Sequence, residues 1–280
     1  LDADILTQGD YYRTDDNLRI NSENDTILIK DYFLHTPSLT SLNGDTITPK
    51  IASLLAINTN SGTLVAFEDP QAIGKITVAD GSVIVQRADQ KISLNNGDFI
   101  YLNDVVEASG GSVGIAFADQ TTMSIDPGAK MVIDEFVYDP EDPTTGSMSA
   151  NVITGNFSFV SGQIAKVGND AMTVTTPVLT IGVRGTQVAG KANTDGEENE
   201  IVLLPNDDGT VGQILIANET GEVLLTKAFE ATTIINAYTV PTVPVILPKE
   251  IVLKKFASTI ATTKKTEAKA EVERETEEAV

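Results

Sequence analysis

The stretches Val113-Gly114-Ile115-Ala116-Phe117 and Thr122-Met123-Ser124-Ile125 decide the fold of this chain. In both, a large apolar residue alternates with a small or polar one. Successive side chains of a strand point to opposite faces of a sheet, so this period of two predicts strands that bury one face. We therefore expect an all-β protein built from short strands of this kind.

Outward from these stretches, the apolar runs are separated by turn sequences rich in Asp, Asn and Gly. Ala79-Asp80-Gly81-Ser82 predicts a hairpin, and Asn95-Asn96-Gly97-Asp98 predicts a turn of the same chemistry. Farther along, Asn206-Asp207-Asp208-Gly209 predicts a hairpin of the two runs that flank it. Very short strands with frequent turns are typical of a solenoid, a sandwich or a barrel. We favour the solenoid, although no fixed sequence period is visible.

The pattern divides the chain into four segments. Residues 1–60 form a small β-rich leading unit with a turn expected at Asn43-Gly44. Residues 73–190 carry the strongest strand pattern, and residues 191–263 predict β-hairpins followed by a proline-rich strap. Residues 264–280 are charged with hardly any apolar residue, so we expect a disordered or helical tail and favour disorder.

Composition excludes several classes of partner and site. The formal net charge of the 280 residues is -21, which argues against binding to nucleic acid or to anionic lipid and suits basic partners. The chain has no cysteine, so it forms neither disulfides nor thiolate metal sites. No apolar run is long enough to predict a transmembrane segment. Because the chain begins with Leu1, we expect it to be a fragment or a processed form.

Three motifs resemble those of the FecR-domain family. Asn96-Gly97-Asp98 with Asn103-Asp104-Val105 resembles the opening motif, and residues 115–125 are similar to the central segment, with Gln120 in place of the usual glycine. Residues 176–186, read as TPVLTIGVRGT, resemble the closing motif. The resemblance covers residues 73–190. The motif residues that it assigns a structural role are Gly97, Asp98, Asp104, Asp119, Pro177, Gly182, Arg184, Gly185 and Thr186.

The resemblance implies a right-handed, twisted β-solenoid-like fold that lies outside the bacterial cytoplasm. In the founding members of the family this domain is the periplasmic part of a membrane anti-sigma regulator, which receives a signal from a TonB-dependent iron transporter. A second group carries the domain near the start of long exported, adhesin-like surface proteins. Residues 134–140, residues 157–166 and the leading unit are similar to that second group.

We therefore expect a non-enzymatic scaffold or binding module of a bacterial surface or secreted adhesin-like protein. Its partners would be other proteins or further domains of the same polypeptide. The alternative is a periplasmic FecR-type signalling regulator that binds a TonB-dependent transporter or another protein. A third hypothesis is a carbohydrate-active β-solenoid enzyme.

Catalytic chemistry is not expected from the residues present. His35 is the single histidine and has no serine motif near it, so an ordinary surface or loop histidine is favoured over a triad. Asp134-Glu135 is the densest pair of acids that a glycosidase could use. The chain has no tryptophan and only 5% aromatic residues, so platforms for sugar binding are scarce.

Calcium is more plausible than catalysis because hard cations bind clustered carboxylates and carbonyls. Asp139, Glu141 and Asp142 form one candidate cluster, and Asp207 and Asp208, beside Asn206, form the other. Neither has the spacing of a known calcium loop. We favour ordinary turn residues for both and expect no cofactor.

Arg184 is the residue of the closing motif that most needs an explanation. It lies in an apolar run between glycines, and few other cations occur between residues 92 and 183. We expect it to close the last coil by pairing with an acid such as Asp119 or Asp134.

The pairing predicts that Arg184→Ala destabilises the module. A melting curve unchanged from wild type would contradict it.

Overall fold

The computed structural model describes residues 10–14, 16–22, 26–35, 37–40, 46–47, 52, 56–58, 71–87, 90–142, 144–168 and 171–278. The chain forms two compact units, Leu1–Pro70 and Gln71–Val280. Each unit is described by itself. The turn expected at Asn43-Gly44 lies outside the described residues.

The first unit is a small β-structure. Its elements are β1 (Asp10–Thr14), β2 (Asn17–Asn21), β3 (Thr26–Ile29), α2 (Tyr32–His35), β4 (Leu39–Thr40), β5 (Thr46–Ile47) and β6 (Ile57–Asn58). Strands β1, β2 and β3 pair antiparallel in sequence order, and β6 pairs parallel to β1. Leu18 and Ile20 of β2 are fully buried together with Tyr32, so alternate residues of the central strand supply this small core.

The second unit consists of two sheets that share one long strand, β15 (Gly146–Val160). Sheet I has the order β10-β7-β12-β13-β15-β18-β19-β22-β23. Its other strands are β7 (Gly74–Ala79), β10 (Phe99–Ile100), β12 (Val113–Phe117), β13 (Thr122–Ile125), β18 (Gln187–Ala192), β19 (Asn199–Leu204), β22 (Glu230–Ile234) and β23 (Val245–Ile246).

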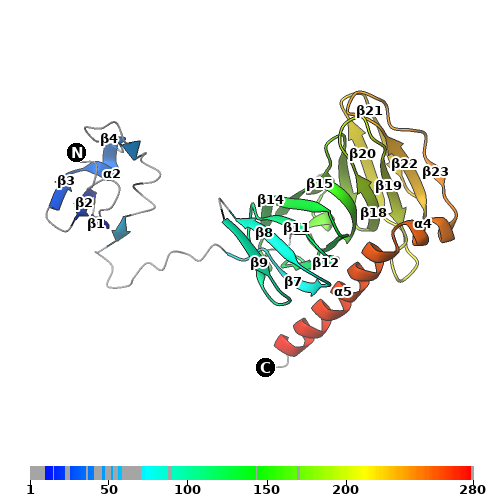
Figure 1. Ribbon diagram of the computed structural model, residues 1–280, viewed down its shortest axis with the longest axis horizontal. Helices are drawn as coiled ribbons and strands as arrows, with labels where there is room; N and C mark the ends of the chain where they lie inside the picture. Colours follow the sequence, from blue (N-terminus) through cyan, green and yellow to red (C-terminus); the bar gives the residue numbers. More distant parts are fainter. Residues whose placement is uncertain are drawn as a thin grey trace. The chain divides into compact units, whose positions relative to one another are not determined.

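Sheet II has the order β9-β8-β11-β14-β15-β16-β17-β20-β21. Its other strands are β8 (Val83–Arg87), β9 (Gln90–Leu94), β11 (Val105–Ala108), β14 (Lys130–Tyr138), β16 (Met172–Thr175), β17 (Thr180–Arg184), β20 (Gln213–Asn218) and β21 (Gly221–Leu225). From β7 in sheet I and from β8 in sheet II onward both orders follow the chain, so the structure grows from one end to the other (Figure 1).

The all-β expectation is confirmed, but the strands do not stack as the parallel coils of a right-handed solenoid. Among the described strands of this unit, every pairing is antiparallel except β15–β16. The physical reason is that the chain makes hairpins, such as β12–β13 and β18–β19 in sheet I and β16–β17 and β20–β21 in sheet II. A hairpin reverses the chain, whereas a coil keeps each strand in the same direction.

Two of the turns predicted to close hairpins instead carry the chain from one sheet to the other. The turn at Asp80-Gly81 connects β7 of sheet I to β8 of sheet II, and these two strands do not pair. Residues 206–209 likewise connect β19 of sheet I to β20 of sheet II. The local sequence predicted the turns correctly, but the partner of each strand is set by burial in the two-sheet core.

The core lies between the two sheets and confirms the period of two. In β13, Met123 and Ile125 point into the core, and Thr122 and Ser124 occupy the opposite face. In β15, Phe157 and Phe159 are fully buried. Gly190 lies opposite Phe157 in the register, and a Cβ there would lie 2.6 Å from the Phe157 ring, so glycine makes room for the aromatic side chain.

Two helices cover the outer face of sheet I. They are α4 (Lys249–Lys255) and α5 (Ala257–Glu278), and α5 packs over β7, β12, β13 and β15 (Figure 1). The preference for a disordered tail is therefore wrong, because residues 264–278 belong to α5. Val252 of α4, Phe256 between the two helices and Ile260 of α5 form an apolar cluster with residues of β18, β19 and β22, and this cluster anchors the start of α5. Within the described part of the chain, no helix is long and apolar enough to cross a membrane.

Candidate functional site

The carboxylate of Asp119 organises the turn between β12 and β13. The side chain is fully buried, and it accepts hydrogen bonds from the backbone N–H and the hydroxyl of Thr121, at 3.0 and 2.8 Å. It also accepts a bond of 3.3 Å from the backbone N–H of Ile164, at the start of the 3₁₀ helix η1 (Ile164–Lys166). One carboxylate thus joins a hairpin to a segment far along the chain, and its negative charge is met by donors rather than by a cation.

The backbone around Asp119 is close-packed. The carbonyl oxygen of Asp119 accepts a bond from the N–H of Gln163 at 2.8 Å. A Cβ on Gly162 would collide with the same carbonyl, so this position requires glycine. Gln120 has a φ of 72°, the left-handed region that favours glycine. This geometry explains why the resembling family has glycine at the position that Gln120 occupies here.

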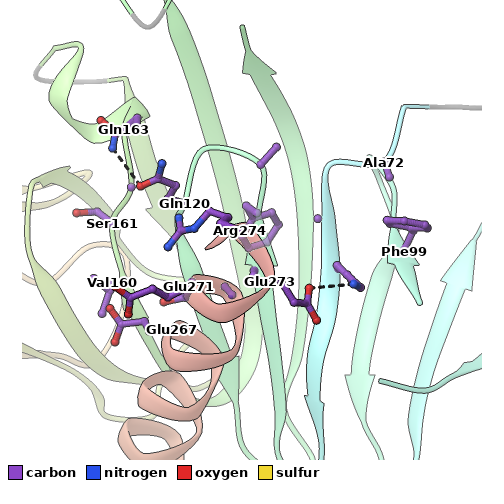
Figure 2. A pocket seen from close by; sticks show the side chains of 18 of the residues that line it. Ala72, Phe99, Gln120, Val160, Ser161, Gln163, Glu267, Glu271, Glu273 and Arg274 are labelled. Atoms are coloured by element: carbon purple, nitrogen blue, oxygen red, sulfur yellow. Dashed lines mark hydrogen bonds and ion pairs between the residues drawn. The ribbon is translucent and has the colours of Figure 1, made fainter. Parts of the chain in front are cut away.

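This turn forms the rim of a groove beside α5, called the α5 groove, with a volume of about 570 Å³ (Figure 2). Its wall on the sheet side includes Lys75, Phe99, Phe117, Gln120, Thr122, Gln163 and Lys166. Its wall on the helix side consists of Glu267, Ala270, Glu271, Glu273 and Arg274. Figure 2 shows Glu267, Glu271 and Arg274 projecting from α5 beside the sheet, with the Gln120 to Gln163 hydrogen bond on the rim.

The α5 groove is lined by charges of both signs. Lys75 from β7 forms an ion pair of 2.9 Å with Glu273 of α5. Lys166 of η1 donates to the side chain of Gln163 at 3.3 Å and also lines the groove. Burial raises the pKa of Glu267, and repulsion from Asp207 raises it further, while Lys264 lowers it. Such a surface offers hydrogen bonds and ion pairs to a bound chain segment.

The opening motif of the resembling family occupies two corners between the sheets. Gly97, with a φ of 94°, lies in the turn that leads from β9 to β10, and the side chain of Asp98 accepts a bond from the N–H of Asn95 at 2.7 Å. Asp104 is buried and binds Arg87 of β8 through both carboxylate oxygens, at 2.8 and 2.7 Å. The hydrogen bonds that Arg87 donates to Asp104 raise the pKa of Arg87. Both acids therefore hold turns in place.

The closing motif forms a hairpin and a third corner. Pro177 lies exposed in the β16–β17 turn, where the N–H of Thr176 donates to the carbonyl of Leu179 at 2.9 Å. Gly182 lies within β17, and Gly185, with a φ of 60°, directly follows that strand. Thr186 then leads into β18, and its N–H donates to the hydroxyl of Ser161 at 2.8 Å. The motif thus guides the chain from sheet II back to sheet I beside the groove rim.

The ion pair expected between Arg184 and Asp119 or Asp134 is wrong. Arg184 ends β17 on the outer face of sheet II, opposite the buried Ile181 and Val183, and it forms no ion pair with any acid in the described part of the chain. The carboxylate of Asp119 is already occupied by Thr121 and Ile164. Because Arg184 is partly exposed at the end of its strand and forms no ion pair in the described part of the chain, Arg184→Ala should change stability by less than about 0.5 kcal/mol.

The candidate calcium ligands serve as turn residues. Asp139 accepts a bond from the N–H of Glu141, and Asp142 accepts bonds from the N–H and hydroxyl of Thr144. Asp208 accepts two bonds from Thr210, which lower its pKa, and Asp207 pairs with Lys264 at 2.7 Å. No group of three acidic or histidine side chains that could hold a metal ion occurs among the described residues.

Among the candidate catalytic residues, Asp134 and Glu135 are exposed on β14 of the second unit. His35 ends α2 of the first unit. Glu135 pairs with the hydroxyl of Ser147 on the neighbouring strand. The groove residues on α5 were missed from the sequence because the tail was expected to be disordered. The signal that could have found them is the spacing of Thr259, Thr263 and Thr266, which places the three on one helix face.

Residues 103–207 match the model of the FecR family, described as FecR protein. The match supports the FecR family. It includes Asp104, Asp119 and the whole closing motif, and it begins after Gly97 and Asp98.

Two crystal structures of a candidate anti-sigma factor from Parabacteroides distasonis are similar to this chain. The first, at 1.65 Å resolution, is 14% identical over 60% of this chain and 73% of that chain, with a TM-score of 0.40. The second, at 2.50 Å resolution, is 13% identical over 57% of this chain and 73% of that chain, with a TM-score of 0.38. The comparison with curated proteins found no match.

Gln120→Gly is expected to stabilise the FecR-matching segment by about 0.5–1 kcal/mol, because glycine adopts the left-handed backbone without the strain of a Cβ. The loss of the bond to Gln163 offsets part of this gain. Urea unfolding of the full chain measures the difference, with Gln163→Ala as the control that removes this bond together with the bond that Lys166 donates to Gln163. A Gln120→Gly chain less stable than Gln163→Ala would contradict the backbone argument.

Glu267→Gln should make stability less dependent on pH. The folded pKa of Glu267 lies above its ordinary value of 4.5, so the folded chain holds this proton more tightly than the unfolded chain does. Stability from this group is therefore lost as pH rises from 4.5 through the raised pKa. The glutamine variant stays uncharged, so it should melt above wild type at pH 7 and close to it at pH 4.

Thermal melts at both pH values check this expectation, and Glu275→Gln, an exposed position on the same helix, is the matched control. An equal gain from both variants would show that the effect comes from overall charge.

Proposed function

We propose that this chain is the extracytoplasmic, protein-binding part of a FecR-type signalling regulator, and that it works in the periplasm. The observation that carries the proposal is the FecR match over residues 103–207. Those residues supply the centre of both sheets, the Asp119 turn and the rim of the α5 groove. The part of the chain that is similar to the family therefore supplies much of the sheet-side wall of the candidate site, and α5 supplies the other wall.

The geometry favours recognition over catalysis. The α5 groove is an open surface between a helix and a sheet, and its polar groups are already engaged in bonds such as Lys75–Glu273 and Gln163–Gln120. A hydrolase would need a nucleophile beside a base, or two acids facing one cleft. Asp134 and Glu135 are neighbours on an exposed strand, and Glu135 is paired with Ser147. A polysaccharide-degradation assay with Asp134→Asn and Glu135→Gln variants tests the carbohydrate-active enzyme directly.

The charge of the chain favours a partner with a basic surface. With a net charge of -21, the protein repels nucleic acid and anionic lipid and attracts cationic protein surfaces over several ångströms. A transporter domain or another envelope protein with a basic face would fit this surface.

A scaffold of an adhesin-like protein, at the cell surface or secreted, is the second candidate. It is favoured by the separate unit Leu1–Pro70, which precedes the FecR-matching unit as a compact body with its own core. In that case the chain would display neighbouring domains, and its groove would contact parts of the same polypeptide.

The two candidates predict different consequences of deleting the full-length gene in the native bacterium. A regulator predicts altered transcription of a discrete set of genes, measured by RNA sequencing, because the signal is lost. A display scaffold predicts unchanged transcription and weaker surface attachment, which would overturn the regulator proposal.

A point variant tests whether the transcriptional effect depends on the α5 groove. Phe99→Asp changes a half-exposed side chain of the α5 groove. Leu224→Asp changes a similarly exposed side chain on β21, an edge strand of sheet II. We expect the first to reproduce the transcriptional effect of the deletion and the second to leave transcription as in wild type. Equal behaviour of the two variants would place the partner elsewhere on the molecule.

A further inference from the structure

Helix α5 is held on sheet I by two different kinds of contact along its length. At its beginning, Phe256 and Ile260 are part of an apolar cluster with Val202 and Leu204. After that turn, the buried face of α5 consists of threonines. Thr259, Thr262, Thr263 and Thr266 are nearly or fully buried against the sheet, at the spacing of one helix face.

The sheet presents a matching surface of small and hydroxyl side chains. Thr263 donates to the hydroxyl of Ser124 on β13 at 2.9 Å, and the hydroxyls of Ser112 and Ser258 lie 2.8 Å apart. Gly114 makes room for the helix, because a Cβ there would collide with the hydroxyl of Thr266. Little apolar surface is removed from water along this part of α5, so the hydrophobic effect contributes little to holding it.

Two buried hydroxyls in this interface have no partner within the described part of the chain. Thr266 on α5 is fully buried and Thr122 on β13 is 3% exposed, and neither hydroxyl oxygen forms a hydrogen bond. A buried hydroxyl without a bond costs free energy. The sheet face can therefore offer a bond, at Thr122, that α5 does not use.

Local ion pairs contribute the remaining attraction, and salt weakens them. Residues 257–278 contain three lysines, one arginine and six glutamates, so α5 as a whole is net negative and only these local pairs draw it to the sheet. Lys264 pairs with Asp207 at 2.7 Å, and Lys265 pairs with Asp80 at 3.7 Å. All four side chains are more than half exposed, so each pair is weak and is screened by ions.

The helix also leaves space on both of its sides. The α5 groove of about 570 Å³ lies on one side, and a second cavity of about 600 Å³, lined by Thr77, Lys269 and Val272, lies on the other. Both are open to solvent and flank the threonine stripe of the helix.

We propose that the outer face of sheet I is a helix-docking surface that α5 occupies reversibly, and that the partner is a helix with two adjacent lysines and with Thr, Ser or Ala at positions i, i+3, i+4 and i+7. The apolar cluster at Phe256 keeps α5 tethered while its remaining turns leave the sheet. The partner helix then binds the same face of sheet I. Ser124 and Gly114 contact its small residues, and Asp80 and Asp207 pair with its lysines. This inference rests on the proposed protein-binding function and specifies its partner.

The test uses a fluorescent peptide with the sequence of residues 257–278, added to the full chain and followed by anisotropy. The chain has no cysteine, so Ser124→Cys with Thr263→Cys introduces a single disulfide that locks α5 in place. Thr263→Glu places a charge in the buried stripe and frees the face, because a buried unpaired carboxylate is unfavourable.

We expect the Thr263→Glu chain to bind the peptide about tenfold more tightly than wild type, since the competing helix is released. The oxidised double-cysteine chain should not bind it, and reduction should restore binding. A peptide that carries Thr263→Glu and Thr266→Glu is the matched control and should not bind.

Equal binding to the oxidised and reduced double-cysteine chains would overturn the proposal, as would a folded Thr263→Glu chain that fails to bind. If the Thr263→Glu chain fails to bind, hydrogen exchange of the wild-type chain shows whether α5 leaves the sheet at all. If residues 261–278 of wild type exchange as slowly as β13 at every salt concentration, α5 is a permanent part of the fold. These results concern the purified chain, so they are independent of whether deletion of the gene alters transcription.

Discussion

The structure of the second unit depends on one strand that belongs to both sheets. Residues 146–154 of β15 pair in sheet II and residues 155–160 pair in sheet I. The change occurs at Gly155, which has a φ of 99° and no room for a Cβ beside Ala129. Because the strand is continuous, the two sheets cannot slide relative to each other, and the spacing of the core between them is fixed at this point. The turns before and after β15 therefore connect strands whose positions in the two sheets are fixed.

The residues that resemble the FecR motifs are found at those corners. Asp104 and Gly97 lie where the chain passes between sheets before β11, and Gly185 and Thr186 lie where it returns to sheet I. Asp119 joins the β12–β13 turn to the segment that follows β15. Each position needs either a buried acceptor for backbone N–H groups or a backbone conformation that favours glycine. These needs explain why such residue types recur at those positions in the family.

The strands could be predicted because alternate burial produces an alternating apolar pattern in the sequence, as at Met123 and Ile125. The pairing of the strands could not be predicted. The turn at Asp80-Gly81 reverses the chain in the same way whether the next strand lies in the same sheet or in the other one. Arg184 was misassigned since its apolar neighbours suggested burial, whereas it lies on the outward face of β17. Helix α5 was missed because the side chains that it buries are threonines, which a composition analysis counts as polar.

The hydroxyl-lined face of sheet I under α5 also matters during synthesis of the protein. Strands β7, β12 and β13 are synthesised long before residues 257–278, so the face that α5 will cover stays bare while the rest of the chain emerges. A bare apolar sheet face would attract other nascent chains and aggregate during that interval. Ser112, Ser124 and Thr122 can instead bond to water until the helix arrives. The same hydroxyl side chains that receive the helix can therefore keep the uncovered face of the sheet hydrated.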